Sequence, residues 1–464
     1  MRRARRILTV AAALAAAAPA SAQTTWRVGP DAPIASIGEA LERAAPGDTV
    51  RVGPGVYRER LVVERPVVLL GEGEPVVDAG GEGHVIEAFA PIELRGFLLR
   101  ASGTSVDEEH AGVMVREARA TVVDNRIEDV LYGVYLKNAP GSLVARNAIR
   151  GKRFAPPRRG DGIRLWYSNG TTIEANRVDR VRDVVVYFSD SLVARGNRIT
   201  DSRYGLHYMY SDHSRLEGNR MSGNHVGAFL MYSTDIELVD NVFHDAEGAS
   251  GMGLGLKDAD RIVAEGNLFV ENAVGIHLDN APRSVGATNR FENNAVVRNG
   301  SGVRLLPSVA GNDFGGNDFL GNEWPVEVAG GARPGVEEQN DWRGNHWDGY
   351  AGFDRDGDGV GDTPWVYARL SDALLTKHPP LRLFAGSPAL ELLELAARFL
   401  PLLRPEPVAV DPAPRLDTVA VDRWRGERVG EELPGPVSRA GWAGAWAALA
   451  LGAIVLLRRG GRTR

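Results

Sequence analysis

The sequence predicts an all-β protein, a parallel β-solenoid with a short capping helix at its N-terminal end and a helical, membrane-bound C-terminal segment. Two observations predict the solenoid. The first is an asparagine that recurs every 21 to 29 residues, most often every 22, with an apolar residue two positions later. The second is a glycine–apolar–any–apolar motif in the same repeat, such as GVYL at 133, GLHY at 205 and GIHL at 275. Short strands separated by Asn and Gly turns bury their apolar residues only when successive coils stack.

The asparagine repeat sets the expected size of the stack. Asparagine side chains in stacked corners can hydrogen-bond from coil to coil, which favours asparagine there. The repeat and its flanking caps predict about eight to eleven coils. In one coil, DVVV at 183, aspartate replaces the glycine of the motif. The recurring asparagines are Asn125, Asn147, Asn176, Asn197, Asn219, Asn241, Asn267 and Asn289.

The N-terminal part of the chain predicts export and a cap. Residues 1–22 have a basic start, an apolar run and a small-residue finish, which is typical of a secretory signal peptide. The segment SIGEALERAAPGDTV (36–50) begins with a short helix that can cover the first coil. The solenoid with its caps is expected over residues 23–385. The chain has no cysteine, so no disulfides stabilise it, and its net charge of −6 excludes a nucleic-acid-binding role.

The C-terminal part predicts a membrane attachment. Residues 386–405 carry apolar residues at helical spacing, which predicts an amphipathic helix. It could lie on a membrane, on the outer face of a transporter, or on the end of the solenoid. Residues 406–439 are expected to form a Pro-rich linker. The uncharged run 440–457 predicts a transmembrane anchor, and the arginines of the tail 458–464 place that tail inside. The alternative for this run is a sorting signal that is later removed.

The outward side of the middle coils carries an unusual set of residues. Side chains alternate along a strand, so the second and fourth residues after the motif glycine point outward. The outer coils have charged residues there, whereas the middle coils have apolar ones. A contiguous exposed apolar patch usually marks a partner site. The predicted patch consists of Trp166, Val185, Tyr187, His207, Met209, Phe229 and Met231.

Three residues of this patch can bind a soft metal. Met209 and Met231 occupy equivalent places in adjacent coils, about 4.8 Å apart, and His207 lies about 6.6 Å along the strand from Met209. Thioether and imidazole groups suit Cu(I), and in a chain without thiolates they are the available soft ligands. Two interpretations stay open: a copper contact, or a protein-docking surface alone. In both, Trp166, Tyr187 and Phe229 are the expected docking residues.

An acidic loop near the end of the solenoid predicts a different kind of site. Asp354, Asp356 and Asp358 alternate in DRDGDGVGD, and Asp362 follows, as at the start of an EF-hand calcium loop. The bidentate glutamate of such a loop is absent, because Trp365 stands in its place. Two interpretations of this loop stay open: a structural Ca²⁺ site, and a solvated acidic turn without an ion. Hard oxygen ligands do not select Cu(I), so this loop is separate from the copper question.

Several segments together resemble the NosD family, the periplasmic maturation factors of nitrous oxide reductase. They are the Asn/Gly coils, the opening GDTVRVGPGVYRERLVV, the insertion RRGDGIRL, the coils GLHYMYS and GAFLMYS, and the closing NHWDGYAGFDRDGDGVGDTPW. The resemblance covers roughly residues 25–385. It implies a right-handed parallel β-helix of the carbohydrate-binding/sugar-hydrolase (pectin-lyase-like) type. The C-terminal anchor is not assumed for every member of that family.

The resemblance also implies a role and partners. The role is assembly of the copper–sulfide centre of nitrous oxide reductase in the periplasm, with Cu(I) as transient cargo. The partners are an ABC transporter permease and ATPase (NosY- and NosF-like), a NosL-like copper chaperone and the reductase itself. With the predicted anchor, the protein is expected to be held at the inner membrane.

The rival function is an enzyme, a polysaccharide lyase or epimerase, or a carbohydrate-binding β-helix. Such chemistry needs paired carboxylates, or a base with a cation, in one cleft. The outward positions offer Arg164 and scattered lysines but no carboxylate pair on adjacent coils. No G-x-S-x-G motif and no phosphate-binding loop occurs. The sequence therefore favours a protein that is not an enzyme.

Overall fold

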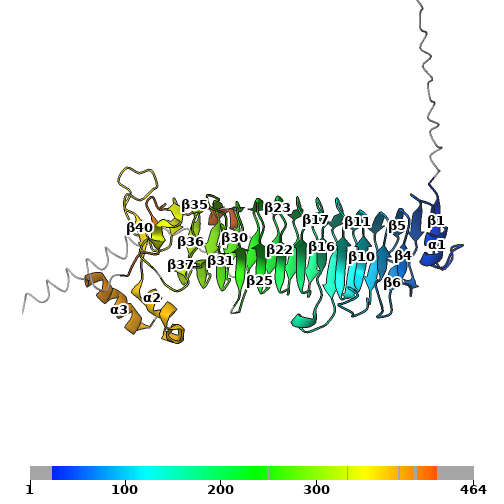
Figure 1. Ribbon diagram of the computed structural model, residues 1–464, viewed down its shortest axis with the longest axis horizontal. Helices are drawn as coiled ribbons and strands as arrows, with labels where there is room; N and C mark the ends of the chain where they lie inside the picture. The colour runs from blue at the N-terminus through cyan, green and yellow to red at the C-terminus, as the bar shows by residue number, and fades with distance from the viewer. Residues whose placement is uncertain (1–22, 249, 332, 385–386, 401–404, 426–464) are drawn as a thin grey trace, which may run out of the picture.

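The computed structural model describes residues 23–425, except 249, 332, 385–386 and 401–404. The chain winds into a long rod whose walls are three parallel β-sheets, with α1 at one end and α2 and α3 beside the other (Figure 1). The sheets have 14, 12 and 13 strands and are called sheets 1, 2 and 3 in that order. Every third strand returns to the same sheet, one coil further along.

The strands of sheet 1 are β1 (Thr25–Val28), β2 (Thr49–Val52), β5 (Val67–Gly71), β8 (Ile92–Arg95), β11 (Ala120–Val123), β14 (Leu143–Ala145), β17 (Thr172–Glu174), β20 (Val193–Arg195), β23 (Ser214–Glu217), β26 (Ile236–Val239), β29 (Val263–Glu265), β32 (Asn289–Glu292), β35 (Asn312–Gly315) and β38 (Asp341–Arg343). Those of sheet 2 are β4 (Leu61–Val63), β7 (Ile86–Ala88), β10 (Ala111–Arg116), β13 (Tyr132–Lys137), β16 (Ile163–Trp166), β19 (Asp183–Tyr187), β22 (Tyr204–Met209), β25 (Val226–Met231), β28 (Met252–Lys257), β31 (Val274–Asp279), β34 (Ser301–Leu305) and β37 (Trp324–Val328). Those of sheet 3 are β3 (Val56–Tyr57), β6 (Val76–Asp78), β9 (Leu98–Arg100), β12 (Arg126–Val130), β15 (Ala148–Gly151), β18 (Arg177–Asp179), β21 (Arg198–Thr200), β24 (Arg220–Ser222), β27 (Val242–His244), β30 (Leu268–Val270), β33 (Ala295–Val297), β36 (Asp318–Leu320) and β39 (His346–Trp347).

The described helices are α1 (Ile37–Arg43), α2 (Leu370–Lys377) and α3 (Pro388–Phe399), with 3-10 turns at η1 (Pro156–Arg158), η2 (Val336–Glu338), η3 (Pro379–Phe384) and η5 (Val421–Trp424). An antiparallel pair, β40 (Trp365–Tyr367) and β41 (Ala409–Asp411), joins the end of the rod. Helix α1 is N-capped by Ser36 and buries Ile37, Ala40 and Leu41 against the first strands.

The all-β parallel solenoid is confirmed, but the predicted number of coils is too low. The rod has about thirteen coils instead of eight to eleven. The extra coils lie at both ends. At the N-terminal end the asparagine signal is lost: at the coil before Asn125, Phe97 holds the equivalent position and donates its N–H to Asn125 Oδ1 (3.1 Å). After residue 305, the stack continues through β35 to β39, and the asparagine ladder continues through Asn317 and Asn345.

Buried asparagines form a ladder along the rod. In each rung, Oδ1 accepts hydrogen bonds from the backbone N–H and Nδ2 of the asparagine one coil earlier, as between Asn197 and Asn219 (3.0 and 2.9 Å). The ladder passes from Asn267 to Asn294. Asn289, which the spacing assigned to this ladder, instead begins a second one with Asn312 (3.1 Å), because this coil is longer than the 22-residue repeat.

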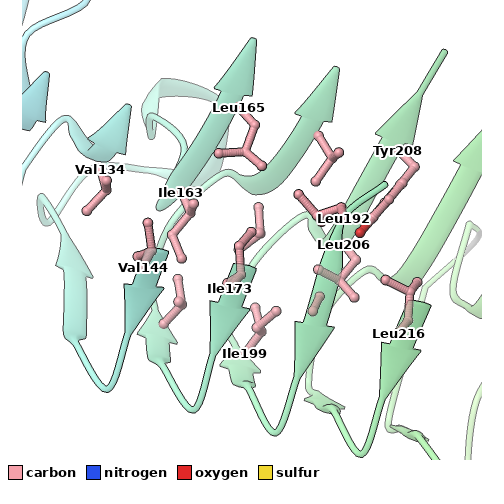
Figure 2. Packing of buried hydrophobic residues seen from close by; sticks show 14 of the residues in the cluster. Val134, Val144, Ile163, Leu165, Ile173, Leu192, Ile199, Leu206, Tyr208 and Leu216 are labelled. Atoms are coloured by element: carbon pink, nitrogen blue, oxygen red, sulfur yellow. The ribbon is translucent and has the colours of Figure 1, made fainter. Parts of the chain in front are cut away.

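The interior of the rod is apolar. Val134, Ile163, Leu165 and Leu206 of sheet 2 face side chains of sheet 1, such as Ile173 (Figure 2). Toward the C-terminal end, aromatic rings stack from coil to coil, for example Phe319 on Trp347 (4.3 Å between centroids) and Trp347 on Trp365 (3.6 Å).

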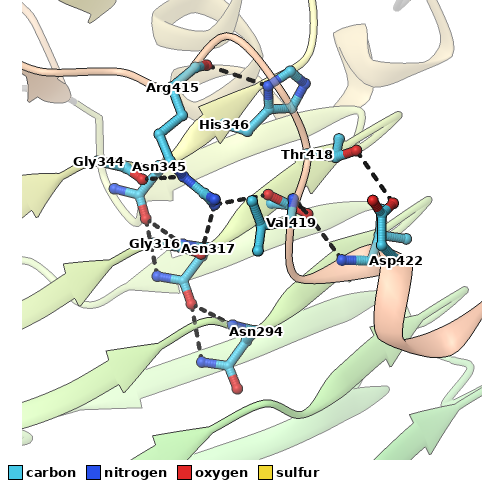
Figure 3. Close-up of polar contacts among 12 residues, drawn as sticks. Asn294, Gly316, Asn317, Gly344, Asn345, His346, Arg415, Thr418, Val419 and Asp422 are labelled. Atoms are coloured by element: carbon cyan, nitrogen blue, oxygen red, sulfur yellow. Dashed lines mark hydrogen bonds and ion pairs between the residues drawn. The ribbon is translucent and has the colours of Figure 1, made fainter. Parts of the chain in front are cut away.

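The segment predicted as a Pro-rich linker (406–439) is described up to residue 425, and there it packs on the rod. Asp411 accepts hydrogen bonds from Asn345 N (2.9 Å), Asn345 Nδ2 (3.0 Å) and Trp347 Nε1 (3.0 Å). The Arg415 guanidinium donates to Gly344 O (2.6 Å) and Gly316 O (2.7 Å) beside the asparagine ladder (Figure 3). The prediction of a free linker is wrong for these residues, because their side chains supply partners that the last coil lacks.

The C-terminal helices form a hairpin attached to the last coils. Within the predicted amphipathic segment, α3 packs on α2. Asp372 of α2 accepts hydrogen bonds from Trp324 Nε1 (3.0 Å) and Tyr367 Oη (2.6 Å). Among the residues that the structure describes, no helix is both long and apolar enough to span a bilayer. The predicted signal peptide (1–22), anchor (440–457) and tail (458–464) lie outside the described residues.

Candidate functional site

The predicted outward residues lie on sheet 2 in two columns set by the strand register. One column runs Arg164, Val185, His207, Phe229, and the other runs Trp166, Tyr187, Met209, Met231. The structure thus pairs Met209 directly with Met231 in adjacent strands, and His207 lies on the same side of β22 as Met209. Leu206 and Tyr208 alternate with them and point into the core (Figure 2). We call Trp166, Tyr187, His207, Met209, Phe229 and Met231 the central face.

The central face is less exposed than the sequence predicted. His207 is 5% exposed and Val185 1%, whereas Trp166, Tyr187, Met209, Phe229 and Met231 are half-buried. The rings of Tyr204 and Tyr187 cover the imidazole, with centroids 4.7 and 5.1 Å from it. The prediction of a contiguous exposed patch is therefore wrong for His207 and Val185. The sequence pattern did not show that Tyr204, at the start of β22, folds over this face.

The buried imidazole of His207 has two polar neighbours. Its Nδ1 lies 3.3 Å from Asp183 Oδ2 and 3.1 Å from the Tyr187 hydroxyl. Burial acts to raise the pKa of Asp183, but hydrogen bonds from His207 and Arg203 outweigh it, so the pKa lies below its ordinary value. Burial and then the charges of Asp183 and Asp161 raise the pKa of Tyr187 to about 12. Asp183 is therefore ionised and Tyr187 neutral at pH 7.

A second buried carboxylate lies one coil earlier. The Asp161 side chain is 1% exposed and receives a hydrogen bond from Arg164 (3.0 Å). Arg182 Nε lies 3.6 Å from Asp161 and 3.8 Å from Asp183, so one guanidinium faces both carboxylates. Burial, and then the charge of Asp183, raise the pKa of Asp161 to about 6.

These two aspartates correct one sequence observation. A carboxylate pair does lie on adjacent coils. Asp161 precedes the motif glycine Gly162, and Asp183 replaces the motif glycine of the next coil, so neither occupies an outward position. The signal that could have revealed Asp183 is the loss of glycine at that place in DVVV. Both side chains are almost fully buried and paired with arginines, so neither lies in an open cleft.

The N-terminal part of the outward side is covered. Met114 and Tyr135 are fully buried, and Phe154 of the 151–159 insertion packs over them. Both insertions of the repeat lie at one edge of the rod. Arg159 of the first and Glu247 of the second line a cavity of 270 Å³ that also contacts Arg203.

An aromatic ladder, which the sequence analysis missed, borders the central face. Tyr167, Phe188, Tyr210 and Tyr232 follow the outward residues of four successive coils, and their rings stack at 5.1, 5.3 and 4.9 Å. All four have φ between 49 and 53°. The equivalent residues of other coils, such as Asn138 and Asp258, share this left-handed conformation, so it belongs to the turn of the repeat and not to the aromatic residues. The sequence pattern that marks this ladder is an aromatic residue directly before serine, in WYS (166–168), YFS (187–189) and MYS (209–211 and 231–233).

The acidic loop has the predicted cluster with one exception. Asp354, Asp356 and Asp358 each offer an oxygen within 4.8 Å of the others, but Asp362 is not in this group and accepts from Arg355 N (2.6 Å). Hydrogen bonds from the backbone N–H groups of this turn, first that of Gly359, lower the pKa of Asp354. Trp365 stacks on Trp347, which explains why the glutamate position of a calcium loop is aromatic here. Calcium binding stays a prediction.

The comparisons with known proteins point to one family. A family described as periplasmic copper-binding protein (NosD) matches residues 145–352, which include every residue of the central face. The probable ABC transporter binding protein NosD of Pseudomonas aeruginosa is 29% identical over 438 residues, 82% of this chain and 93% of that protein. The protein of the same name from Stutzerimonas stutzeri is 27% identical, over 76% of this chain and 84% of that protein. Together, the family match and the two relatives support a NosD-family protein.

Solved structures resemble this NosD-family chain less closely. The catalytic unit of a GH87 α-1,3-glucanase from Streptomyces thermodiastaticus is 15% identical, covers 74% of this chain and 71% of its own, and has a TM-score of 0.48. The A-module of the mannuronan C-5 epimerase AlgE4 from Azotobacter vinelandii is 15% identical over 62% of this chain and 91% of its own, with a TM-score of 0.41.

Proposed function

We propose that this NosD-family chain is a periplasmic accessory factor for assembly of the copper–sulfide centre of nitrous oxide reductase. In this role it works with an ABC transporter of a NosY-like permease and a NosF-like ATPase, and with a NosL-like copper chaperone. The family description and the names of the two relatives support copper binding and a transporter partner. The single observation that carries the proposal is the pairing of Met209 with Met231 beside His207.

The copper contact is proposed at these three side chains. Cu(I), as cargo, would be held by the two thioethers and by His207 Nε2, since Nδ1 faces Asp183 and Tyr187. The donor set fits a soft monovalent ion, and the chain has no thiolate that would compete for it. Half-buried aromatic residues around the sulfur atoms keep water away, and a partner can complete the coordination.

The docking surface for chaperone or reductase is proposed around the copper contact. Trp166, Tyr187 and Phe229 are half-buried and line the same side of sheet 2. The aromatic ladder extends this surface, with Tyr167 and Tyr210 about half exposed. Exposed aromatic side chains are common anchors at protein interfaces, because a large apolar area is ordered at little entropic cost.

The transporter contact is proposed at the C-terminal end of the rod. Helix α3 exposes Leu392 (67%), Leu395 (48%) and Phe399 (76%), which we call the hairpin face. These side chains lie on a helix that packs on α2 through its other side, where Ala397 is buried. An exposed apolar helix face beside a groove suits a membrane-embedded partner better than water.

We also propose that the chain is not an enzyme. Acid–base chemistry on a polysaccharide needs two carboxyl groups that reach the substrate. The aspartate pair beneath the central face, Asp161 and Asp183, is buried and paired with arginines.

The experiment that tests the copper contact replaces Met209 and Met231 with Leu. This change removes both sulfur atoms and keeps size and polarity similar, so folding should be preserved. We expect weaker Cu(I) retention in competition with a colorimetric chelator, and reductase that lacks its copper–sulfide centre in cells. Uronate release from pectin and alginate, measured alongside, should be absent.

The matched control is Met221→Leu, which removes a sulfur atom from the core, far from solvent. Normal Cu(I) retention and normal reductase in the double variant would contradict the copper contact. If Tyr187→Asp with Phe229→Asp then still blocks reductase maturation, the central face is a docking surface only.

A further inference from the structure

Among the coils of sheet 2 from β10 to β34, one lacks the motif glycine of the repeat. In its neighbours the motif glycine is required because the backbones approach too closely for a Cβ. A Cβ on Gly133 would lie 2.1 Å from the Gly162 carbonyl oxygen, and a Cβ on Gly205 would lie 2.4 Å from that of Gly227. Asp183 stands at the equivalent place, and the β19–β22 pairing accommodates it with a register shift between Asp183 and Val185. The neighbouring pairings β13–β16 and β22–β25 show no shift.

The side chain that replaces this glycine is a fully buried carboxylate. Asp183 Oδ1 accepts hydrogen bonds from Arg203 Nε (3.0 Å) and Tyr204 N (3.2 Å). Oδ2 accepts one from the terminal nitrogen of Arg203 and faces His207 Nδ1 at 3.3 Å. Burying a carboxylate destabilises a fold unless every partner is in place. Because the coils on both sides, from β10 to β34, carry glycine here, the repeat itself gives no structural reason for an aspartate.

We propose that Asp183 is the positioning residue of the copper contact, holding the ring proton of His207 on Nδ1 so that Nε2 is free to bind Cu(I). The inference rests on the proposed copper role of His207. An ionised carboxylate only accepts hydrogen bonds, so the nitrogen that faces it carries the proton. Metal-binding histidines commonly donate their second ring N–H to a carboxylate, which fixes both the tautomer and the ring orientation.

The other neighbours of the imidazole fit the same tautomer. The Tyr187 hydroxyl lies closer to Nδ1 (3.1 Å) than to Nε2 (3.5 Å), so it can share the Nδ1 proton as a second acceptor. In the opposite tautomer, the Nδ1 lone pair would face the Asp183 carboxylate, which is repulsive. Arg203 holds both Asp183 oxygens and so keeps the carboxylate ionised and turned toward the ring.

The first test reads the tautomer directly, in the metal-free full chain. With ¹⁵N-labelled histidine, the ring signal of His207 is one of nine and is assigned by its loss in His207→Gln. We expect the Nδ1–H tautomer in the wild type. In Asp183→Asn, the amide oxygen keeps Arg203 as its partner and the NH₂ group donates to Nδ1, so the signal should change to the Nε2–H tautomer. Asp161→Asn, which neutralises the neighbouring carboxylate, should leave it unchanged. The same tautomer in wild type and Asp183→Asn would overturn the proposal.

The second test measures Cu(I) affinity by chelator competition. Loss of such a partner typically lowers metal affinity 10- to 100-fold, and we expect a loss of that size in Asp183→Asn and Asp183→Gly. Asp183→Gly restores the residue that the neighbouring coils carry, so its thermal unfolding midpoint should stay close to that of the wild type while the affinity falls. Unchanged affinity in Asp183→Gly would overturn the positioning role. Wild-type affinity in His207→Gln would instead refute the proposed copper contact itself, and the tautomer measurement would still decide the role of Asp183.

Discussion

Asp161 is the residue whose ionisation opposes folding most clearly. Its side chain is buried next to a second carboxylate, and this raises its pKa to about 6 from an ordinary value near 3.8. A carboxyl group with a raised folded-state pKa stabilises the fold while it is protonated. That contribution is complete below about pH 4 and is lost as the pH rises through 6. Arg164 and Arg182 compensate the charge that remains.

Replacing Asp161 with Asn should remove this dependence on pH. We expect the free energy of unfolding of the variant, relative to the wild type, to rise by up to about 3 kcal/mol between pH 4 and pH 7, since each pKa unit corresponds to about 1.4 kcal/mol. Chemical denaturation at several pH values measures the difference. Asp107→Asn, in an exposed turn, is the matched control. A constant offset between variant and wild type across this range would mean that Asp161 has an ordinary pKa.

Among the elements, the C-terminal hairpin stands apart from the rod. Helices α2 and α3 contact each other, and the link to the solenoid runs through Asp372, which Trp324 and Tyr367 hold. The hairpin face is largely exposed, with Leu392 67%, Leu395 48% and Phe399 76% accessible. A deletion from residue 387 onward would also remove Asp411 and Arg415, which hold the last coils. Point substitutions are therefore the cleaner way to test this surface.

Leu392→Glu combined with Leu395→Glu should abolish co-purification with the transporter permease. Both side chains are exposed, so the substitutions should leave the thermal unfolding midpoint and the far-UV spectrum unchanged. A pull-down from solubilised membranes measures the association. Val285→Glu alters a fully exposed apolar residue in the turn between β31 and β32 and should have no effect. Normal co-purification of the double variant would place the transporter contact on the coils instead.

Across the whole molecule, stability is a sum over neighbouring coils, so the two ends are the weak points of the rod. At the C-terminal end of the asparagine ladder, no further asparagine accepts hydrogen bonds from the N–H groups of Asn345. Asp411, 66 residues further along the chain than Asn345, accepts hydrogen bonds from two of them and from Trp347. This contact makes the segment after the hairpin part of the fold and not an appendage.

Asp411→Ala should loosen the rod from that end. The change strands buried donors of Asn345 and Trp347, and each unsatisfied buried group costs about 1–3 kcal/mol. Hydrogen exchange should accelerate most in β38 and β39, less in the preceding coils, and not in the coils around α1. Asp417→Ala, in the same segment, is the control. Uniform acceleration along the whole rod would contradict an end-cap role.

Local repetition explains why much of the fold could be predicted. The Asn and Gly signals recur in the middle coils, and parallel register then brings Met209 beside Met231 without further information. The N-terminal coils were missed because residues such as Phe97 replace the asparagine, and the C-terminal coils because their spacing departs from 22 residues.

Contacts between distant segments explain what could not be predicted. Tyr204 folds over His207 next to the register shift at Asp183, and no periodic pattern encodes that. Asp411 and Arg415 contact residues 64 to 99 positions earlier, and a Pro-rich composition hides such contacts.

The parallel register also determines how far apart the two proposed contacts lie. Met231 on β25 and Trp324 on β37, which holds the hairpin, are separated by four strand spacings of sheet 2. At about 4.8 Å each, the separation is about 19 Å. No side chain crosses that gap, and the hydrogen bonds between coils prevent the rod from shortening it. The solenoid is thus a spacer of fixed length, and an ion bound at Met231 would have to leave the protein to reach the proposed transporter contact.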